Sequence, residues 1–177
     1  MRIAYMILAL TGMLSSVRAT TLRSLSMSDL IQQSTSIVHV KVAGSGSAFR
    51  GQEIYTYYQL QILETLKSGG ASTTQVAVPG GVAGGLRQSV AGAPSLSTGG
   101  EYVIFLWTSR SGLTQIMGLS QGLFSVIQDQ AGNSLLVRPA ASGLVLNQSG
   151  GVAGNQAVTI SLNDLKTQIQ QLLGAGH

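Results

Sequence analysis

Cysteine is absent from all 177 residues of the chain, and histidine occurs only twice. The absence of cysteine excludes disulfide bonds, thiolate catalysis and a lipid anchor on a cysteine. Metal sites gather several histidines, cysteines or carboxylates, and the two histidines and six acidic residues are too scattered to predict one. The sequence therefore predicts no bound metal, no cofactor, and a fold held together by packing alone.

Charge is also scarce, because Lys, Arg, Asp and Glu make up 9% of the chain, against roughly 25% in ordinary globular domains. The ten basic residues exceed the six acidic ones, but Arg2 and Arg18 lie at the extreme N-terminus. The others are spread along the sequence, whereas proteins that bind nucleic acid gather them in patches. The composition thus argues against nucleic acid as a partner.

The first residues have the pattern of a secretory signal peptide. Arg2 provides a positive start, residues 3–14 are mostly apolar, and Val17 and Ala19 offer modest side chains to a signal peptidase. The apolar run is shorter than the ~20 residues that a transmembrane helix needs. We therefore expect residues 1–19 to be a signal peptide and the protein to be periplasmic or extracellular. We expect no membrane span after cleavage.

Short alternating runs of apolar and polar residues predict a mainly β protein. Strands are expected at 37–42, 54–67, 76–78, 101–108, 113–119, 122–128 and 135–137, with a further short one at 144–146. The segment GSGSAFRG at 44–51 is predicted as a turn or loop. Because strands and helices do not alternate, a doubly wound sheet is disfavoured.

A helix is expected near each end of the mature chain. Residues 25–34 would form a short one capped by Ser26 or Ser28, and residues 161–174 a longer amphipathic one. The complete prediction is a small antiparallel OB-like barrel over residues 20–138, a loop or linker at 139–160, and the C-terminal helix packed on the barrel.

The glycine-rich segment VPGGVAGGLRQSVAGAP at 78–94 fails the tests for phosphate binding. Gly80 and Gly85 fit a P-loop, but Leu86 and Arg87 stand where it requires Lys and Ser or Thr. We instead expect a mobile flap or a tight hairpin over the mouth of the barrel. As a hypothesis, this segment grips a ligand through Gly80, Gly81, Gly84, Gly85, Arg87 and Gln88.

Residues 118–122 read GLSQG and match the Gly-x-Ser-x-Gly elbow of serine hydrolases. The chain order permits Ser120 as nucleophile, Asp129 or Asp164 as the acid, and His177 as the base. However, an elbow joins a strand to a helix, and the following LFSVIQ is predicted as a strand. His177 is also the last residue, where fraying is expected. Catalysis is therefore the alternative interpretation.

Other polar and aromatic residues have ordinary structural explanations. His39 alternates with valines and is expected on a solvated strand face. Several aromatic residues could stack on sugars or bases, but we favour packing in the core and across strands for them. These are Tyr55, Tyr57, Tyr58, Phe105 and Trp107.

The segments SDLIQQSTSIVHVKV, IYTYYQLQILETLKSG, VAVPGG and GLSQGLFSV resemble a group of exported bacterial proteins without assigned activity. The order of strands, and GEYVIFL at 100–106 above all, is similar to netrin-like modules and tissue inhibitors of metalloproteinases. That resemblance implies an OB-type barrel. Those inhibitors reach the protease zinc through an amino-terminal cysteine that this chain lacks, so zinc-protease inhibition is not implied.

The leading interpretation is an exported, non-catalytic binding protein. Its ligand would be a protein, a peptide or an envelope polymer, held at an open barrel face or by the 80–99 loop. A small serine hydrolase using Ser120 and a structural component of the cell envelope are the alternatives.

Overall fold

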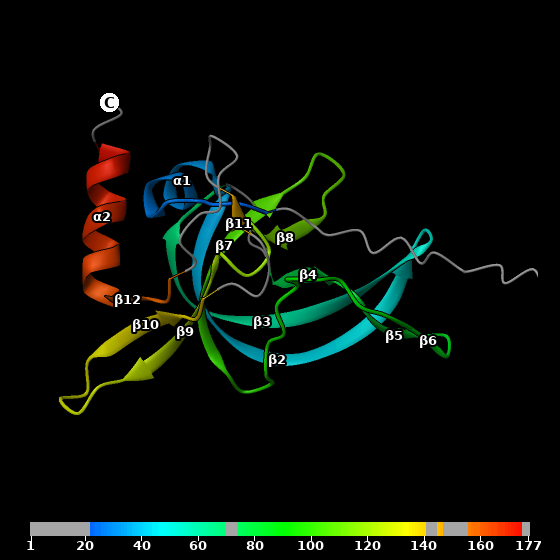
Figure 1. The fold of residues 1–177 in the computed structure, drawn as a ribbon. Coiled ribbons are helices and arrows are strands. Elements are labelled where there is room, and N and C mark those ends of the chain that lie inside the picture. The colour runs from blue at the N-terminus through cyan, green and yellow to red at the C-terminus, as the bar shows by residue number, and fades with distance from the viewer. Residues whose placement is uncertain (1–21, 70–73, 141–144, 147–155, 175–177) are drawn as a thin grey trace, which may run out of the picture.

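The computed structural model describes residues 22–69, 74–140, 145–146 and 156–174. These residues form a mainly β protein with two helices, as predicted (Figure 1). The large sheet has the order β12 (Val158–Ser161), β10 (Ser134–Arg138), β9 (Leu123–Gln128), β7 (Glu101–Thr108), β2 (Ser36–Arg50), β3 (Glu53–Lys67), β4 (Gln75–Pro79) and β8 (Thr114–Ile116). Two small sheets pair β1 (Leu22–Arg23) with β11 (Val145–Leu146) and β5 (Gly81–Ala83) with β6 (Leu86–Gln88).

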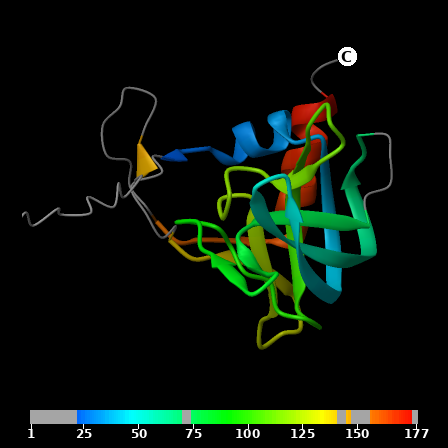
Figure 2. The same ribbon diagram turned by 90° about the vertical axis from the view of Figure 1, so that its right-hand side faces the viewer.

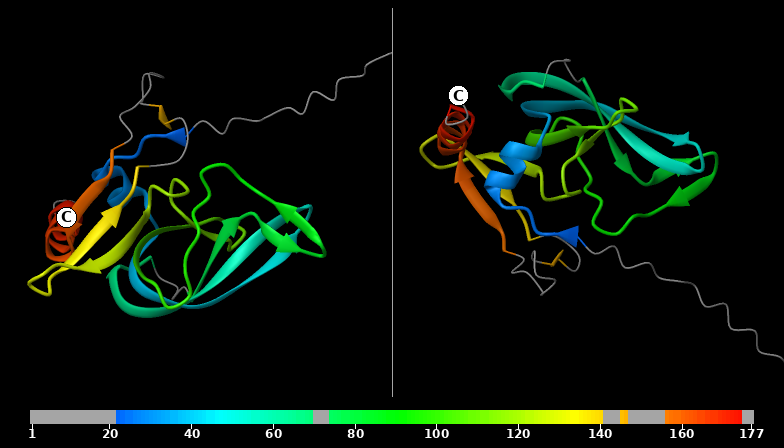
Figure 3. Two further views of the ribbon diagram at one scale, coloured as in Figure 1. Left: turned by 60° about the horizontal axis from the view of Figure 1, so that its bottom comes forward. Right: turned by 90° about the horizontal axis from the view of Figure 1, so that it is seen from above.

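The large sheet curls because β8 bonds to strands on two sides. It lies antiparallel to β7 through three residue pairs and meets β4 through one parallel pair, Ala77 with Gln115. The part formed by β7, β2, β3, β4 and β8 therefore bends back toward itself (Figure 3). With only that one pair between β4 and β8, the closed barrel expected from the sequence is not confirmed.

The longest elements, β2 and β3, form one antiparallel hairpin of two 15-residue strands. The predicted turn at 44–51 is wrong, because β2 continues to Arg50 and the chain reverses at Gly51, whose φ is 64°. Gly44 and Gly46 pair with Gln59 and Tyr57 of β3, so they do not mark a turn. Register shifts interrupt the pairing at three places between Ile37 and Gly44. Such bulges bend a strand and increase its twist.

Two other segments also differ from the sequence prediction. β12 begins at Val158, inside the segment 139–160 that was predicted as a loop, and pairs with β10. The strand expected at 113–119 ends at Ile116, since residues 117–122 form a succession of turns.

Two hydrophobic cores lie on opposite faces of β7. Tyr102, Ile104 and Leu106 pack inside the curled part of the sheet, and Val103 and Phe105 pack on the other face. The second core is closed by α1 (Met27–Gln33) and α2 (Leu162–Gly174). Strand β7 is thus buried on both faces, in agreement with its uninterrupted apolar sequence.

Both helices have side-chain caps at their N-termini. At α1, Asp29 N donates to Ser26 Oγ and Ser26 N donates to Asp29 Oδ2, each at 3.0 Å, which completes a capping box. The hydrogen bonds from Ser26 lower the pKa of Asp29. At α2, Asp164 N donates to Ser161 Oγ at 3.0 Å.

Lys67, the last residue of β3, closes the other end of α1. Its Nζ donates to the carbonyl oxygens of Ile31, Gln32 and Ser34 at 2.7, 3.0 and 2.6 Å. The last carbonyls of a helix lack partners within the helix, so this ammonium group supplies them. Burial lowers the pKa of Lys67. The contact fixes α1 to the sheet.

We predict that Lys67→Met lowers the free energy of unfolding by about 2 kcal/mol, because it removes charge-assisted hydrogen bonds from three carbonyl groups. Urea unfolding measures the change. Lys166→Met is the matched control, since Lys166 pairs with Glu64 on the surface and should cost less than ~1 kcal/mol. Equal losses in the two variants would contradict this role of Lys67.

Candidate functional site

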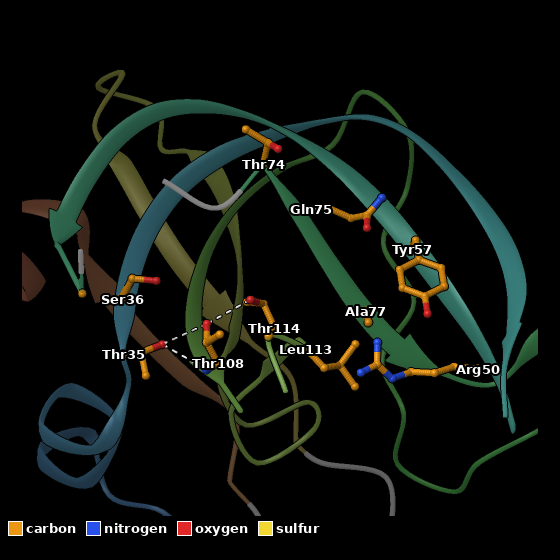
Figure 4. Close-up of a pocket in the computed structure, with 12 residues that line it drawn as sticks. Thr35, Ser36, Arg50, Tyr57, Thr74, Gln75, Ala77, Thr108, Leu113 and Thr114 are labelled. Atoms are coloured by element: carbon orange, nitrogen blue, oxygen red, sulfur yellow. Dashed lines mark hydrogen bonds between the residues drawn. The ribbon is translucent and has the colours of Figure 1, made fainter. Parts of the chain in front are cut away.

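The main candidate site is a cavity of about 610 Å³ where β3, β4 and β8 approach one another (Figure 4). Tyr57, Gln75 and Ala77 line it from the face of β3 and β4 that is opposite to the core residues Tyr58 and Val76. The other residues lining it are Thr35, Ser36, Arg50, Gly69, Thr74, Thr108, Gly112, Leu113 and Thr114.

Hydroxyl groups dominate one end of this cavity. Thr35 Oγ1 accepts a hydrogen bond from Thr108 N at 3.1 Å, and the hydroxyls of Thr108 and Thr114 are 2.9 Å apart. Thr35 Oγ1 also donates to the carbonyl oxygen of Leu106 at 3.1 Å. These bonds hold the hydroxyl groups in fixed positions, where they can exchange hydrogen bonds with a polar ligand.

The other end carries a single guanidinium and a phenol. Figure 4 shows the Arg50 side chain beside Leu113, on the same side of the cavity as Tyr57 and Gln75. Arg50 is the only charged residue among the described residues that line the cavity. Its Nη2 donates to Ser111 Oγ at 3.3 Å, which leaves most of its five N–H donors for other partners. This end can therefore hold a carboxylate or another anion.

The strand edges at the cavity are incompletely paired. β4 bonds to β3 through five residue pairs, but on its other side it meets β8 only at Ala77. Along this edge Gln75 is exposed whereas Val76, Ala77 and Val78 are buried, so backbone groups are accessible to an added chain at the Gln75 end of β4.

The glycine-rich segment proposed as a binding loop contains the β5–β6 hairpin, which is one of the two forms expected from the sequence. Gly84 and Gly85 form its turn with φ of 56° and 77°, which glycine tolerates best. Gly81 lies so close to β2 and β3 that a Cβ would be 2.5 Å from the hydroxyls of Ser47 and Thr56. The carbonyl of Gly80 accepts from Thr56 Oγ1 at 2.8 Å. These glycines serve the packing of the hairpin.

The two polar residues of that hairpin have different environments. Gln88 Oε1 accepts a hydrogen bond from Ile54 N at 2.8 Å, so its side chain is used to fix the hairpin to β3. Arg87 is exposed and is available to a partner.

The GLSQG motif forms a compact turn between β8 and β9, and no helix follows it. Gly118 and Leu119 have φ of 60° and 57°, and a Cβ on Gly118 would approach Leu25 Cδ1 to 2.8 Å. A Cβ on Gly122 would be 2.7 Å from the carbonyl oxygen of Met117. Gly118 is favoured by its positive φ and Gly122 by the nearby Met117 carbonyl, so the turn accounts for both glycines.

Gln121 of the same motif holds the N-terminal segment in place. Its side chain is buried; Oε1 accepts from Leu25 N and Nε2 donates to the Arg23 carbonyl, both at 2.8 Å. Arg138 Nη1 in turn donates to the carbonyl of Gln121 at 2.7 Å, and its guanidinium lies over the Phe124 ring. Burial lowers the pKa of Arg138. Figure 2 shows β1, the strand held in this way, beside β11.

The residues of the alternative catalytic triad are not brought together. Ser120 Oγ is buried and has no hydrogen-bond partner among the described residues. The Asp129 carboxylate accepts from Ala131 N, Asn133 N and Asn133 Nδ2 within its own hairpin turn, and these hydrogen bonds lower the pKa of Asp129. Asp164 lies at the start of α2, and His177 is outside the described residues. No described base therefore stands within reach of Ser120.

The remaining histidine is engaged elsewhere. His39 Nε2 lies 2.7 Å from Glu101 Oε1 and its side chain is 12% exposed, so the prediction of a solvated face was wrong for this residue. His39 pairs across the sheet with Val103, a buried residue of the core beneath the helices. Nowhere in the described part of the chain do three or more His, Asp or Glu residues gather to hold a metal ion. Within the same residues, no helix is long and apolar enough to cross a membrane.

The chain matches no protein-family model, no curated protein and no solved structure. The resemblance to exported bacterial proteins and to netrin-like modules stays a prediction from the sequence.

We predict that two adjacent residues of the GLSQG turn differ in their contribution to the free energy of unfolding. Gln121→Ala should lower the free energy of unfolding by about 2 kcal/mol, since Leu25 N and the Arg23 carbonyl lose their partners. Ser120→Ala should change it by less than ~0.5 kcal/mol or raise it, because the hydroxyl has no partner to lose. Thermal unfolding and hydrogen exchange at Leu25 measure both effects.

A larger loss of stability in Ser120→Ala than in Gln121→Ala would contradict the role of Gln121 in holding the N-terminal segment. Hydrolysis of a chromogenic ester that disappears in Ser120→Ala would restore the hydrolase interpretation.

Proposed function

We propose that the protein is an exported, non-catalytic binding protein that holds an extended, polar chain segment in the cavity beside β4 and β8. A peptide segment with an acidic group fits this cavity best. The incomplete pairing of β4 with β8 carries the proposal, because it leaves the Gln75 end of the β4 edge exposed in the wall of a polar cavity.

The extended form of the ligand follows from that edge. An extended peptide can add to a sheet edge through main-chain hydrogen bonds, while pockets beside the edge select its side chains. Gln75 and Ala77 of β4 face Leu113 and Thr114 at or beside β8 across the cavity. The main chain of a peptide lying there would exchange hydrogen bonds with the backbone of β4 at Gln75.

The acidic group follows from the charges. Arg50 is the only charged side chain among the described residues of the lining; its cross-strand neighbour Glu53 is not part of the lining and accepts a hydrogen bond from the Tyr55 hydroxyl. A guanidinium binds a carboxylate by two parallel hydrogen bonds, which favours an acidic side chain or a C-terminal carboxylate. The hydroxyls of Thr35, Thr108 and Thr114 suit the polar groups of the same ligand.

Export is proposed from residues 1–19 alone, whose pattern is that of a signal peptide. The ligand would then be a periplasmic or extracellular protein, or a peptide derived from one.

The test is fluorescence anisotropy with a panel of extended peptides that carry Glu or, in the matched set, Gln. We expect the wild type to prefer the Glu peptides, and Arg50→Gln to weaken them about ten-fold and abolish the preference. Tyr57→Ser should also weaken binding. Tyr55→Ser is the matched control, because Tyr55 lies on the same face of β3 with its ring 6.4 Å from Tyr57 but does not line the cavity.

Equal affinities for both peptide sets, or equal effects of Tyr57→Ser and Tyr55→Ser, would contradict binding at this cavity. Absence of retention of any peptide or envelope polymer would favour a structural envelope component.

A further inference from the structure

The net positive charge of the mature chain lies at one end of the molecule. Arg50 at the end of β2 and Arg87 in β6 lie there, with Glu53 as the acidic neighbour across the hairpin. Arg110 in the β7–β8 connection adjoins Ser111, the residue that Arg50 contacts. The other charged residues from residue 20 onward are five basic ones, Arg23, Lys41, Lys67, Arg138 and Lys166, and five acidic ones, Asp29, Glu64, Glu101, Asp129 and Asp164. They cancel, so this end carries the whole excess.

The same end exposes large apolar side chains. Phe49 is 47% exposed, Val82 51% and Leu86 62%, which makes Leu86 the most exposed large hydrophobic residue described. Val82 pairs with Arg87 across the β5–β6 hairpin, and a Cβ on Gly84 would lie 3.1 Å from the Phe49 ring. Successive strand residues point to opposite faces, so Phe49 and Arg50, and likewise Leu86 and Arg87, put an apolar and a cationic side chain on the two sides of these hairpin ends. We name Phe49, Arg50, Val82, Leu86, Arg87 and Arg110 the apolar-cationic tip.

The tip is rigidly supported. Gln88 Oε1 accepts from Ile54 N, Thr56 Oγ1 donates to the Gly80 carbonyl, and Gly80 N donates to the Ile54 carbonyl, all within 2.8 Å. Arg50 joins the β7–β8 connection through its bond to Ser111. Figure 1 shows the β2–β3 turn and the β5–β6 hairpin projecting together at the end away from α2.

We propose that the apolar-cationic tip docks on the surface of an anionic lipid bilayer. Arginines near such a surface are attracted by its negative potential, and exposed apolar side chains bury themselves at the boundary of headgroups and acyl chains. The exposed apolar side chains of Val82 and Leu86 beside Arg87 match both the apolar and the anionic layer of such a surface, whereas an acidic protein surface would match the charge alone. The proposal does not depend on the ligand of the cavity.

The experiment is co-sedimentation of the chain that begins at Thr20, so that the apolar residues 3–14 cannot insert on their own. Circular dichroism confirms that this chain and each variant are folded. The probes are vesicles of phosphatidylcholine alone and of phosphatidylcholine mixed with phosphatidylglycerol. We expect binding to the mixed vesicles, weakened by salt, and none to the neutral ones.

Variants then assign the binding to the tip. Arg87→Gln should weaken it about five-fold, which corresponds to ~1 kcal/mol for one arginine near an anionic surface, and Leu86→Ser roughly ten-fold. Ile127→Ser and Lys41→Gln are the matched controls and should leave the binding unchanged. Ile127 is 48% exposed on the β9–β10 hairpin, and Lys41 is an exposed cation in the middle of β2.

No binding to the mixed vesicles, or equal losses in the tip variants and the controls, would overturn the proposal. Retention on polyglutamate without binding to vesicles would assign the tip to an acidic protein and would overturn it as well.

Discussion

The burial of β7 on both faces is the constraint on which the rest of the structure depends. Alternate residues of this strand enter two different cores, one inside the curled part of the sheet and one beneath the two helices. Without disulfides, these two cores are the principal means of holding the curl, α1 and α2 together. Lys67 adds a polar contact between β3 and the end of α1. Strand β7 thus joins the curled part of the sheet and the two helices into one packed structure.

The candidate site exists because the curled sheet is paired only weakly between β4 and β8. β2 and β3 bend through a series of bulges and carry β4 toward β8, but the two strands share one residue pair. The polar face of β3 and β4 then forms one wall of a cavity, and the β7–β8 connection forms another. The same long β2–β3 hairpin extends past the sheet and supports β5–β6. The cavity and the apolar-cationic tip are two consequences of one long, bent hairpin, and Arg50 belongs to both.

The fold was predictable from the sequence wherever a segment had a strong local pattern. β7 was expected at its observed bounds because apolar residues follow one another there without a break, and Ser26 was one of two expected caps for α1. The extension of β2 beyond Val42 was missed because Gly44 and Gly46 suggested a turn, whereas pairing with β3 continues through both. Tertiary pairing overrode the local preference in this case.

The candidate site was far less predictable. Its lining comes from residues near 35, 50, 57, 75, 108 and 114, and none of these short segments has a motif of its own. The two motifs that were visible, the glycine-rich segment and GLSQG, are used largely for close packing and for holding the N-terminal segment. A threonine hydroxyl or an edge backbone group becomes part of a site only through the pairing of distant strands. That pairing leaves no local signal in the sequence.

The most direct test of the proposed binding site is a map of backbone amide shifts in the chain that begins at Thr20, titrated with an extended acidic peptide. Binding at the open edge predicts the largest changes at Gln75 and Ala77 of β4 and at Leu113 and Thr114, with little change at the β9–β10 hairpin. Changes that centre on the GLSQG turn, or that spread evenly over the surface, would contradict the account.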